Sequence, residues 1–444
     1  MNIYFPLETQ QRELDARIVF CIEAAEKGHK SYFGHKADIY PVFTNLKKGI
    51  YVHKSIQKRK LNQINYLKSL GHYSCSIDEE AIMIPDEEEY FNHRCSKDCI
   101  SALDLFLAWG EKHENLVKNQ YPELKEKIIS AGNSRIDVLK CKENYLIPAN
   151  EIKQKYGNFF LFVTKFGRHN LKKRGWDTWL EMKLANAPHL SKRSHDRIVT
   201  SIDFEKKNIN LTMKTILKLA EEYPKKNILI RPHPTENINT WTKFAESSGF
   251  PNIKVVFTSQ SINPWLIAAE KVISNNCTSS LESAILDIIS LNFIPFESKE
   301  MEYELPKLCS HTVRTFDELK KSLTKKTNFS IDEKLVQKYI KNYGNKSFCS
   351  YLISYLEENI NTSIYSEKNQ PPIRLIFWVQ KFYKKIRKFI SLYFGPLRRR
   401  RSIVQQKCPG FSLNDVRKIA KIYNIPDSIS IKEDWPGVYS FEKY

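Results

Sequence analysis

The sequence has few residues of the kinds that mark fibrous, disordered or disulfide-stabilised chains. Among 444 residues there are only 14 Gly and 19 Pro, too few for a collagen-like or low-complexity chain. The 9 Cys are scattered along the chain, which is typical of free thiols in a reducing compartment and argues against a disulfide framework. With 41% hydrophobic and 27% charged residues, the composition predicts a globular protein of two or three domains.

Membrane-spanning and secretory segments are also missing. No run approaches the roughly 20 uncharged apolar residues that a bilayer-crossing helix needs. The start of the chain, MNIYFPLETQQRELD, has no basic region followed by an apolar run, which argues against a secretory signal. We therefore expect a cytoplasmic protein.

Acidic residues are absent from one stretch near the end of the chain. The net charge is +20, yet residues 368–414 contain 12 Lys or Arg and no Asp or Glu. More than half of the excess positive charge therefore lies in this stretch, which indicates that the segment meets an anionic surface.

The basic stretch has the pattern of an amphipathic helix. After Pro371-Pro372, apolar side chains recur at helical spacing between Leu375 and Tyr393, Lys and Arg fall on the opposite side, and Arg398–Arg401 follow. An aromatic-rich face flanked by cations is typical of a helix in an anionic membrane interface. A helix docked on the protein itself and a nucleic-acid patch are the alternatives, and nucleic acid would leave the apolar face unused. We predict a membrane-interface helix over 371–405, no nucleic-acid partner, and a small helical appendage over 406–444.

Short apolar runs alternate with helical patterns over the first 330 residues, which indicates α/β units around parallel strands. The pattern predicts two Rossmann-like domains, 1–150 and 151–330, joined by a polar linker near 140–154 and facing a cleft that binds ligands at strand carboxyl ends. Return helices are expected over 331–370. The expected strands are residues 2–6, 29–34, 127–131, 159–163, 227–230, 254–257 and 271–274, and the expected helices include one ending at Gly28, 211–223, 264–269, one opening at 281–286, and 332–358.

The sharpest local motif is Arg231-Pro232-His233-Pro234, which directly follows an apolar strand. The prolines fix φ on both sides of His233, so the imidazole is presented at the carboxyl end of the strand beside Arg231. A cation and a hydrogen-bonding imidazole suit a phosphate. A rigid turn with an incidental histidine is the alternative.

A second strand ends in a hydroxyl-rich turn, Asn275-Asn276-Cys277-Thr278-Ser279-Ser280, before a helix. The N–H groups at a helix start, together with hydroxyl groups, can form an anion site. Ser279-x-x-Glu282 also has the spacing of a capping box, which needs no ligand. Since both loops follow strands of one α/β half, we predict that they converge on one nucleotide.

The order of motifs along the chain resembles the surface-carbohydrate-biosynthesis family of two-domain, GT-B glycosyltransferases. That family is related to bacterial transferases that use CMP-activated Kdo or sialic acids and, more distantly, to CDP-polyol transferases of teichoic acid synthesis. One departure is Ser279-Ser280, where a glycine is expected before the glutamate. The resemblance covers roughly residues 1–300 and rests on Ile3–Glu8 with Arg12–Asp15, Trp109-Gly110, Gly132–Asp137, Thr164–Phe166 with Asn170, Arg231–Pro234, Ser261–Trp265 and Cys277–Glu282.

The resemblance implies a GT-B fold and a donor phosphate held by His233 and the hydroxyl-rich turn. No Asp-x-Asp occurs in the chain, so the usual carboxylates for a metal-bound nucleotide sugar are missing and no metal or cofactor is expected. Protein donors must then meet the charge of the leaving phosphate, and a CMP donor, with its single phosphate, needs fewer of them than a diphosphate. The expected donor-binding residues are Lys165, Arg231, His233, Thr278, Ser279, Ser280 and Glu282.

Three acids and an arginine follow the first strand and are expected at the mouth of the N-terminal half. Glycosyl transfer needs a carboxylate to deprotonate the acceptor or to attack the anomeric carbon. We expect this role to fall to Glu8, Asp15 or Glu13, with Arg12 on the acceptor side. Alternatively, these acids only complement the dipole of the following helix.

Taken with the resemblance, these motifs predict a metal-independent, CMP-sugar-dependent glycosyltransferase. It would move an ulosonic acid, Kdo or of sialic type, to a lipid-linked, lipopolysaccharide or capsule acceptor, as a peripheral protein on the cytoplasmic face of the inner membrane. A CDP-polyol phosphotransferase of teichoic-type polymer synthesis is one alternative. A non-catalytic membrane scaffold with a degenerate nucleotide cleft is the other.

Overall fold

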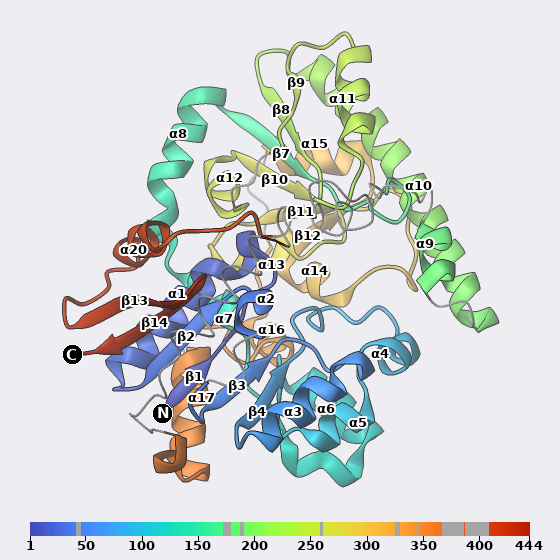
Figure 1. Cartoon of the computed structure of the whole chain (residues 1–444). Helices are drawn as coiled ribbons and strands as arrows, with labels where there is room; N and C mark the ends of the chain where they lie inside the picture. The colour runs from blue at the N-terminus through green and yellow to red at the C-terminus, as the bar shows by residue number, and fades with distance from the viewer. Residues whose placement is uncertain are drawn as a thin grey trace. The chain divides into compact units, whose positions relative to one another are not determined.

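The chain folds into two α/β units, each built around its own sheet (Figure 1). The computed structural model describes residues 1–40, 46–171, 179–186, 191–257, 261–324, 329–344, 347–365, 386 and 408–444. The first unit combines residues 1–141 with residues 337–444, and the second unit is residues 142–336. Helix α16 (Glu333–Tyr339) contains the second crossing between them.

The first unit has an eight-stranded sheet in the order β13-β14-β2-β1-β3-β4-β5-β6. From β2 to β6 all neighbours are parallel, whereas β14 pairs antiparallel with both β13 and β2. The strands are β1 (Asn2–Tyr4), β2 (Lys30–Gly34), β3 (Ile50–His53), β4 (Tyr73–Ile77), β5 (Leu105–Ala108), β6 (Ile128–Ser130), β13 (Ile429–Trp435) and β14 (Val438–Lys443).

Helices cover both faces of this sheet because its strands bury side chains on both sides. Ile3 and Phe5 pack against Ile18 of α1 and Phe348 of α17 in one core, while Tyr4, between them, packs on the other side in a second core. The α-helices are α1 (Gln10–Glu26), α2 (Lys36–Ile39), α3 (Leu61–Ser69), α4 (Glu87–His93), α5 (Lys97–Ala102), α6 (Glu111–Gln120), α7 (Ser134–Lys140), α17 (Phe348–Asn359) and α20 (Leu413–Ile422).

The C-terminal segment is part of the first unit's core and sheet, not a purely helical appendage as predicted. Figure 1 shows β13 and β14, in red, beside the blue β2. Helix α20 begins at a capping box formed by Ser412 and Asp415. In β14, Tyr439 and Phe441 are buried in the core that contains Ile3. The hairpin therefore covers the edge of β2, which would otherwise present unpaired backbone groups.

The second unit has a six-stranded, wholly parallel sheet in the order β12-β11-β10-β7-β8-β9. Its strands are β7 (Phe159–Val163), β8 (Asn227–Arg231), β9 (Ile253–Val255), β10 (Lys271–Ser274), β11 (Ser290–Phe293) and β12 (Ser310–Val313). Its α-helices are α8 (Leu146–Tyr156), α9 (Trp179–Asn186), α10 (Lys192–Glu222), α11 (Ile238–Ser247), α12 (Asn263–Ala268), α13 (Ser279–Ile285), α14 (Glu304–Cys309) and α15 (Phe316–Thr324).

The core on one face of this sheet joins the strands to α10, α11 and α15. Phe160 and Phe162 of β7 pack with Ile216 of α10 and Trp241 of α11. Helix α10 extends much further towards its N-terminus than the predicted residues 211–223, because Ile198 and Phe204 continue its buried face.

The polar stretch near 140–154, predicted as the linker, contains the boundary between the units at residues 141 and 142 and is helical. A 3₁₀ turn at Lys142–Tyr145 leads into α8, which buries Ala149 and Ile152 on one side. Residues three apart share a helix face, so two apolar side chains are enough to dock an otherwise polar segment. Gly157 ends α8 with a positive φ of 65°, a conformation that favours glycine.

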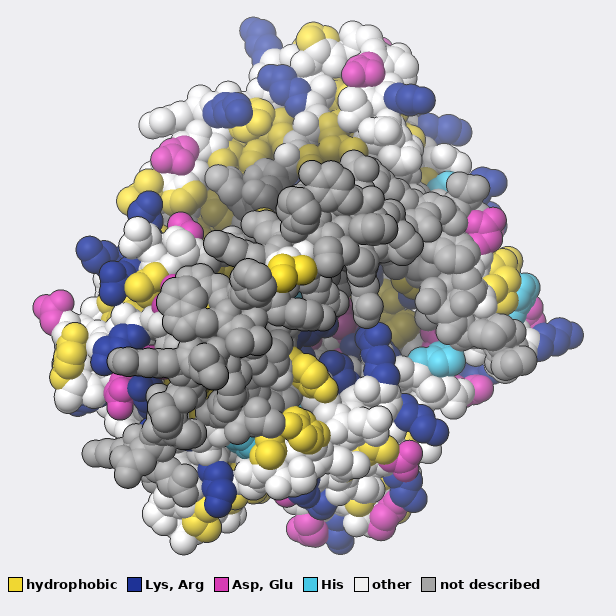
Figure 2. Space-filling model, viewed as in Figure 1, with side chains coloured by type: hydrophobic (Ala, Val, Ile, Leu, Met, Phe, Trp, Pro, Cys, Tyr) yellow, Lys and Arg dark blue, Asp and Glu magenta, His cyan; other side chains and the backbone are white. Residues whose placement is uncertain are grey.

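The surface charge of the described residues is mixed. On the face shown in Figure 2, Lys and Arg side chains are interspersed with Asp and Glu. The predicted membrane-interface helix over 371–405 lies outside the described residues, apart from residue 386. Within the part of the chain that the structure describes, no helix is long and apolar enough to cross a bilayer.

Candidate functional site

Three neighbouring strands of the second sheet end in the loops that carry the predicted donor-binding residues. Strands β10, β7 and β8 are adjacent and parallel, so their carboxyl ends share one edge. Since adjacent strands lie about 4.8 Å apart, the loops after β8 and β10 are separated by about 10 Å, with the β7 loop between them. The structure therefore places the two predicted loops at the same sheet edge, on either side of the β7 loop.

The loop after β8 holds the imidazole of His233 in a defined orientation. Its Nδ1 lies 2.8 Å from Thr235 Oγ1 and accepts a hydrogen bond from Thr235 N at 3.3 Å. Because Nδ1 accepts from a backbone N–H, the neutral ring carries its proton on Nε2. The second ring nitrogen is thereby prepared to donate to an anion.

A buried glutamate that the sequence analysis missed joins the loops after β7 and β8. Glu236 Oε1 accepts hydrogen bonds from Thr164 Oγ1 at 2.8 Å and His233 N at 3.0 Å, and Oε2 accepts from Trp241 Nε1 at 3.0 Å. Burial raises the pKa of its carboxyl against the effect of these bonds. An acid two residues after Pro234 was the signal available in the sequence, and its hydrogen bonds fix the two loops against each other.

Gly167 is required by the same contact between loops. A Cβ at this position would lie 2.4 Å from Thr235 Oγ1, closer than carbon and oxygen atoms approach. Since Thr235 also holds His233, any side chain at residue 167 would displace the group that orients the imidazole.

The loop after β10 is tied to the loop after β7 by hydrogen bonds. Lys165 N donates to Asn275 Oδ1 at 2.8 Å, and Lys165 Nζ donates to the Asn276 carbonyl at 3.3 Å. Asn276 has a positive φ of 46°, which Asn adopts more readily than most residues. Lys165, in the loop after β7, therefore contacts the loop after β10 through both its backbone N–H and its ammonium group.

The hydroxyl groups of the predicted turn have different surroundings. Thr278 is half-buried and is the N-cap residue of α13, but its side chain makes no capping hydrogen bond. Ser279 and Ser280 are buried, and Ser280 Oγ lies 2.8 Å from Ser274 Oγ. The proposed capping box of Ser279 with Glu282 does not form, because Ser279 is already the first helical residue.

Arg231 and Glu282 connect the β8 strand to helix α13 electrostatically. Burial lowers the pKa of Arg231 to about 10, and the negative charge of Glu282 opposes this shift. The Arg231 guanidinium also lies 5.4 Å from the centre of the Trp265 ring. Two predicted donor-binding residues, 51 positions apart in the sequence, are thus close enough to influence each other.

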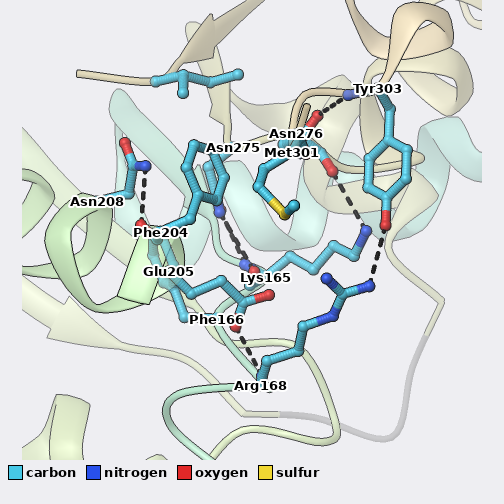
Figure 3. A pocket seen from close by; sticks show the side chains of 11 residues that line it. Lys165, Phe166, Arg168, Phe204, Glu205, Asn208, Asn275, Asn276, Met301 and Tyr303 are labelled. Carbon is cyan, nitrogen blue, oxygen red and sulfur yellow. Dashed lines mark hydrogen bonds between the residues drawn. The ribbon is translucent and has the colours of Figure 1, made fainter. Parts of the chain in front are cut away.

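A small pocket opens beside Lys165 in the second unit (Figure 3). Its free volume is about 20 Å³, room for a water-sized group. Figure 3 shows the side chains of Lys165 and Arg168 extending towards the ring of Tyr303. Lys165 Nζ lies 4.5 Å from the ring centre, and Arg168 Nη2 donates to the Tyr303 hydroxyl at 3.3 Å.

Glu205 of α10 closes the pocket and holds the loop after β7. Its Oε2 accepts from the backbone N–H groups of Arg168 at 2.7 Å and His169 at 3.2 Å. Burial raises the pKa of this carboxyl to about 7. Glu205, Arg168 and Tyr303 were not predicted as site residues, because each lies outside the motifs quoted from the sequence.

Replacing Glu205 with Gln is expected to change how stability depends on pH. The folded pKa of about 7 exceeds the ordinary value of 4.5, so this carboxyl stabilises the fold most below pH 4.5 and the contribution is lost as the pH rises through 7. The full difference corresponds to about 3 kcal/mol. In urea unfolding, Glu205→Gln should gain stability relative to wild type between pH 5 and pH 8. If the stability difference between Glu205→Gln and wild type is the same at pH 5 and pH 8, the raised pKa of Glu205 is wrong. Glu246→Gln, at an exposed position of α11, is the control.

The acids that follow β1 do not form one group. Glu8 Oε2 lies 2.7 Å from Lys36 Nζ. Glu13 is buried and accepts the backbone N–H of Glu8 at 2.9 Å and of Thr9 at 3.3 Å, which agrees with the alternative that it serves the helix start. Asp15 accepts a hydrogen bond from the Tyr423 hydroxyl at 3.2 Å, and burial raises its pKa.

Arg12 is separate from both Glu8 and Asp15. Its guanidinium lies 3.5 Å from Glu80 Oε1, and 40% of its side chain is exposed. Residues two apart on a helix face nearly opposite directions, which is why Glu13 and Asp15 diverge. Of the three predicted acids, Glu8 lies nearest in sequence to the end of β1, and 34% of its side chain is exposed.

A buried ion cluster that the sequence analysis missed lies at the carboxyl edge of the first sheet. Arg17, fully buried, places Nη2 2.6 Å from Glu79 Oε1 and 3.6 Å from Glu13 Oε2, and Lys54 Nζ lies 2.5 Å from Glu13 Oε2. Arg17 Nη1 also donates to Ser134 Oγ at 2.9 Å. The two cations and two carboxylates balance in charge.

The cluster strongly favours the ionised form of Glu79. Burial would raise the pKa of this carboxyl, but the charges of Arg17 and Lys54 outweigh burial and lower it to about 2. Lys54, Glu79 and Asn133 each follow a strand of the parallel sheet, and that shared position was the signal available in the sequence. Among the described residues, no three His, Cys, Asp or Glu side chains are grouped to hold a metal ion.

Comparison with known proteins bears on the fold. No family model and no curated protein matches the sequence. The UDP-GlcNAc 2-epimerase of Methanocaldococcus jannaschii is similar in structure, with a TM-score of 0.51 and 13% identity over 81% of this chain and 100% of that chain. A putative UDP-N-acetylglucosamine 2-epimerase from Listeria monocytogenes has a TM-score of 0.49 and 12% identity, over 83% of this chain and 98% of that chain. The wall teichoic acid polymerase TagF has a TM-score of 0.45 and 12% identity, over 82% of this chain and 89% of that chain.

At 13% identity, likeness to the M. jannaschii enzyme concerns the fold and leaves the function to the site. It extends over both units, each of which has parallel strands with helices on the faces of its sheet. The chain therefore has an α/β fold of the GT-B type.

Proposed function

We propose that the protein is a metal-independent glycosyltransferase that uses a CMP-activated ulosonic acid, Kdo or of sialic type, as its donor. The acceptor would be a lipid-linked glycan of lipopolysaccharide or capsule synthesis. The observation that carries the proposal is the convergence of the loops after β7, β8 and β10 at one sheet edge. Ligands of open α/β sheets bind outside such carboxyl ends.

The chemistry of the converging groups suits a leaving nucleoside monophosphate. Lys165 and Arg231 supply positive charge, and the Nε2–H of His233 supplies a directed donor. Such preorganised donors stabilise the charge that develops on a leaving phosphate. Thr278 adds a hydroxyl from the β10 loop. The chain has no Asp-x-Asp, so these protein groups alone must balance the charge of the leaving phosphate. A donor with one phosphate carries less charge to balance than a donor with two.

A nucleotide screen followed by a turnover assay tests the proposal. We expect CMP to bind the purified protein more tightly than UMP or AMP, and CMP to be released from CMP-Kdo when a glycan acceptor is present. Preference for CDP and turnover of CDP-glycerol would favour a polyol phosphotransferase instead. Undetectable binding of every cytidine nucleotide, unchanged in His233→Ala, would indicate a non-catalytic scaffold.

We also propose that Glu8 deprotonates the acceptor hydroxyl and that Glu13 positions the loop that carries it. Replacing Glu8 with Gln keeps the size of the side chain and removes the base, so turnover should fall about 100-fold to 10,000-fold. CMP affinity should stay at the wild-type value. Asp15→Asn is the matched comparison, because Asp15 lies against Tyr423. Full turnover in Glu8→Gln with loss in Asp15→Asn would transfer the role to Asp15.

The basic segment 371–405 is proposed to bind the anionic cytoplasmic face of the inner membrane, a proposal supported by its sequence pattern alone. The full chain should co-sediment with phosphatidylglycerol-containing vesicles and less so with neutral phosphatidylcholine vesicles, and added salt should weaken the binding. Deletion of 371–405 should abolish co-sedimentation while CMP binding persists. Equal sedimentation of the deleted and full chains would exclude this segment as the anchor.

A further inference from the structure

Two cations and one carboxyl group line the pocket beside Lys165. Lys165 and Arg168 enter it from the β7 loop, and Glu205 is the acid that lines it. The Glu205 carboxyl accepts two backbone N–H groups, and with a pKa of about 7 it is only partly ionised at neutral pH. Although burial raises the pKa of Tyr303, the charges of Lys165 and Arg168 bring it below its ordinary value. An anion in this pocket would therefore meet two cationic side chains and a carboxyl group that is only partly ionised.

The two cations are arranged for an oxyanion. Figure 3 shows both side chains converging beside the Tyr303 hydroxyl, with Arg168 Nη2 3.3 Å from that oxygen and Lys165 Nζ 3.3 Å from the Asn276 carbonyl. A guanidinium matches the geometry of a carboxylate in a way that an ammonium does not. The free volume of about 20 Å³ admits a small group but not a nucleotide.

The pocket adjoins the proposed phosphate-binding loops through Lys165. Lys165 N is bonded to Asn275, and its ammonium reaches the carbonyl of Asn276 in the loop that leads to Thr278. In a CMP-activated ulosonic acid, one carbon bears both the phosphate ester and a carboxylate. The carboxylate of such a donor therefore lies next to its phosphate.

We propose that Arg168, Lys165 and Tyr303 bind the carboxylate of the transferred sugar, so that the enzyme selects acidic sugars over neutral ones. This inference rests on the proposed function and specifies which part of the donor the pocket recognises. Arg168 is a specificity-determining residue in this scheme, Lys165 contacts both carboxylate and phosphate, and Glu205 positions the loop. The second phosphate of a nucleoside diphosphate is the competing anion.

Calorimetric titration of wild type and Arg168→Gln with CMP, CMP-sialic acid, freshly prepared CMP-Kdo and CDP separates these ligands. In wild type, at least one of the two acidic sugar nucleotides should bind more tightly than CMP. Arg168→Gln should weaken that ligand at least tenfold while CMP affinity changes less than twofold. Arg168→Lys keeps the positive charge but loses the planar guanidinium group. Its affinity for that ligand should lie between those of wild type and Arg168→Gln. Lys243→Gln, which removes an exposed cation of α11 outside the pocket, is the control.

Each other outcome has a definite meaning. Retained CMP binding also shows that Arg168→Gln is folded. Two results would refute the carboxylate site while leaving the nucleotide site in place. In the first, wild type binds CMP but binds neither acidic sugar nucleotide more tightly than CMP. In the second, Arg168→Gln weakens the binding of CMP as much as that of the acidic sugar nucleotide. Selective weakening of CDP assigns the pocket to a second phosphate and overturns the proposal. If wild type binds no cytidine nucleotide, the proposed function itself fails.

Discussion

Replacing Arg17 with Met is expected to cost about 3–5 kcal/mol of the free energy of unfolding, because removal of one partner leaves buried opposite charges uncompensated. Arg17 is fully buried and is the direct partner of Glu79 at 2.6 Å. It also donates to Ser134 Oγ and to the Pro6 carbonyl. Methionine restores much of the packing volume over Phe5 but none of these bonds. Urea unfolding followed by circular dichroism measures the loss.

Two companion variants distinguish the loss of charge pairing from the loss of packing. Arg12→Met removes an exposed arginine, 3.5 Å from Glu80, from the same helix and should cost less than about 1 kcal/mol. In Arg17→Met combined with Glu79→Gln, the orphaned carboxylate is neutralised, so part of the stability should return. A loss below about 1 kcal/mol in Arg17→Met would show that the cluster does not hold the first unit together.

Replacing His233 with Ala is expected to lower kcat/KM by about 100-fold to 1,000-fold, the usual effect of removing one preorganised donor from developing negative charge. His233 is positioned on both sides, through Thr235 at Nδ1 and through Glu236 at its backbone N–H. The fold should survive, since the ring is only half-buried. CMP titration and single-turnover CMP release from the donor measure binding and chemistry separately.

The control for His233→Ala is His195→Ala, which removes another partly exposed imidazole, from α10 in the same unit. It should leave both measurements unchanged. Thr235→Val removes the hydroxyl that holds Nδ1 and should give a smaller loss than His233→Ala, since the backbone N–H remains. Wild-type turnover in His233→Ala would refute the donor site built on this loop.

Much of the strand pattern was predictable because a buried parallel strand is a local signal. Phe159–Val163 and Lys271–Ser274 have the predicted bounds, and Gly28 follows α1 with a positive φ of 82°. Each needs only a short apolar run or a residue that tolerates an unusual backbone conformation. Elements whose docking depends on one or two side chains, such as α8 and the N-terminal half of α10, were missed or shortened.

The C-terminal strands were not predictable for a related reason. Strand β14 buries its first four residues, Val438–Phe441, but its partner β2 is about 400 residues earlier in the chain. Nothing local indicates that Tyr439 and Phe441 would complete the core around Phe33. Pairing between segments so distant is decided by the free edge that the sheet offers.

The sequence by itself determined the α/β character and the three strand-to-loop motifs of the second unit, because apolar runs and prolines act within a few residues. Only the tertiary structure decided which of those groups meet. Thr164 reaches Glu236 because neighbouring parallel strands place the loops that follow them at one sheet edge. Arg17 reaches Glu79 because α1 packs against the first sheet. Glu13 and Asp15, two residues apart, diverge because the helical repeat turns them to opposite sides. Residues close together in the sequence determine each local motif, whereas the order of strands in the sheet determines which motifs form one site.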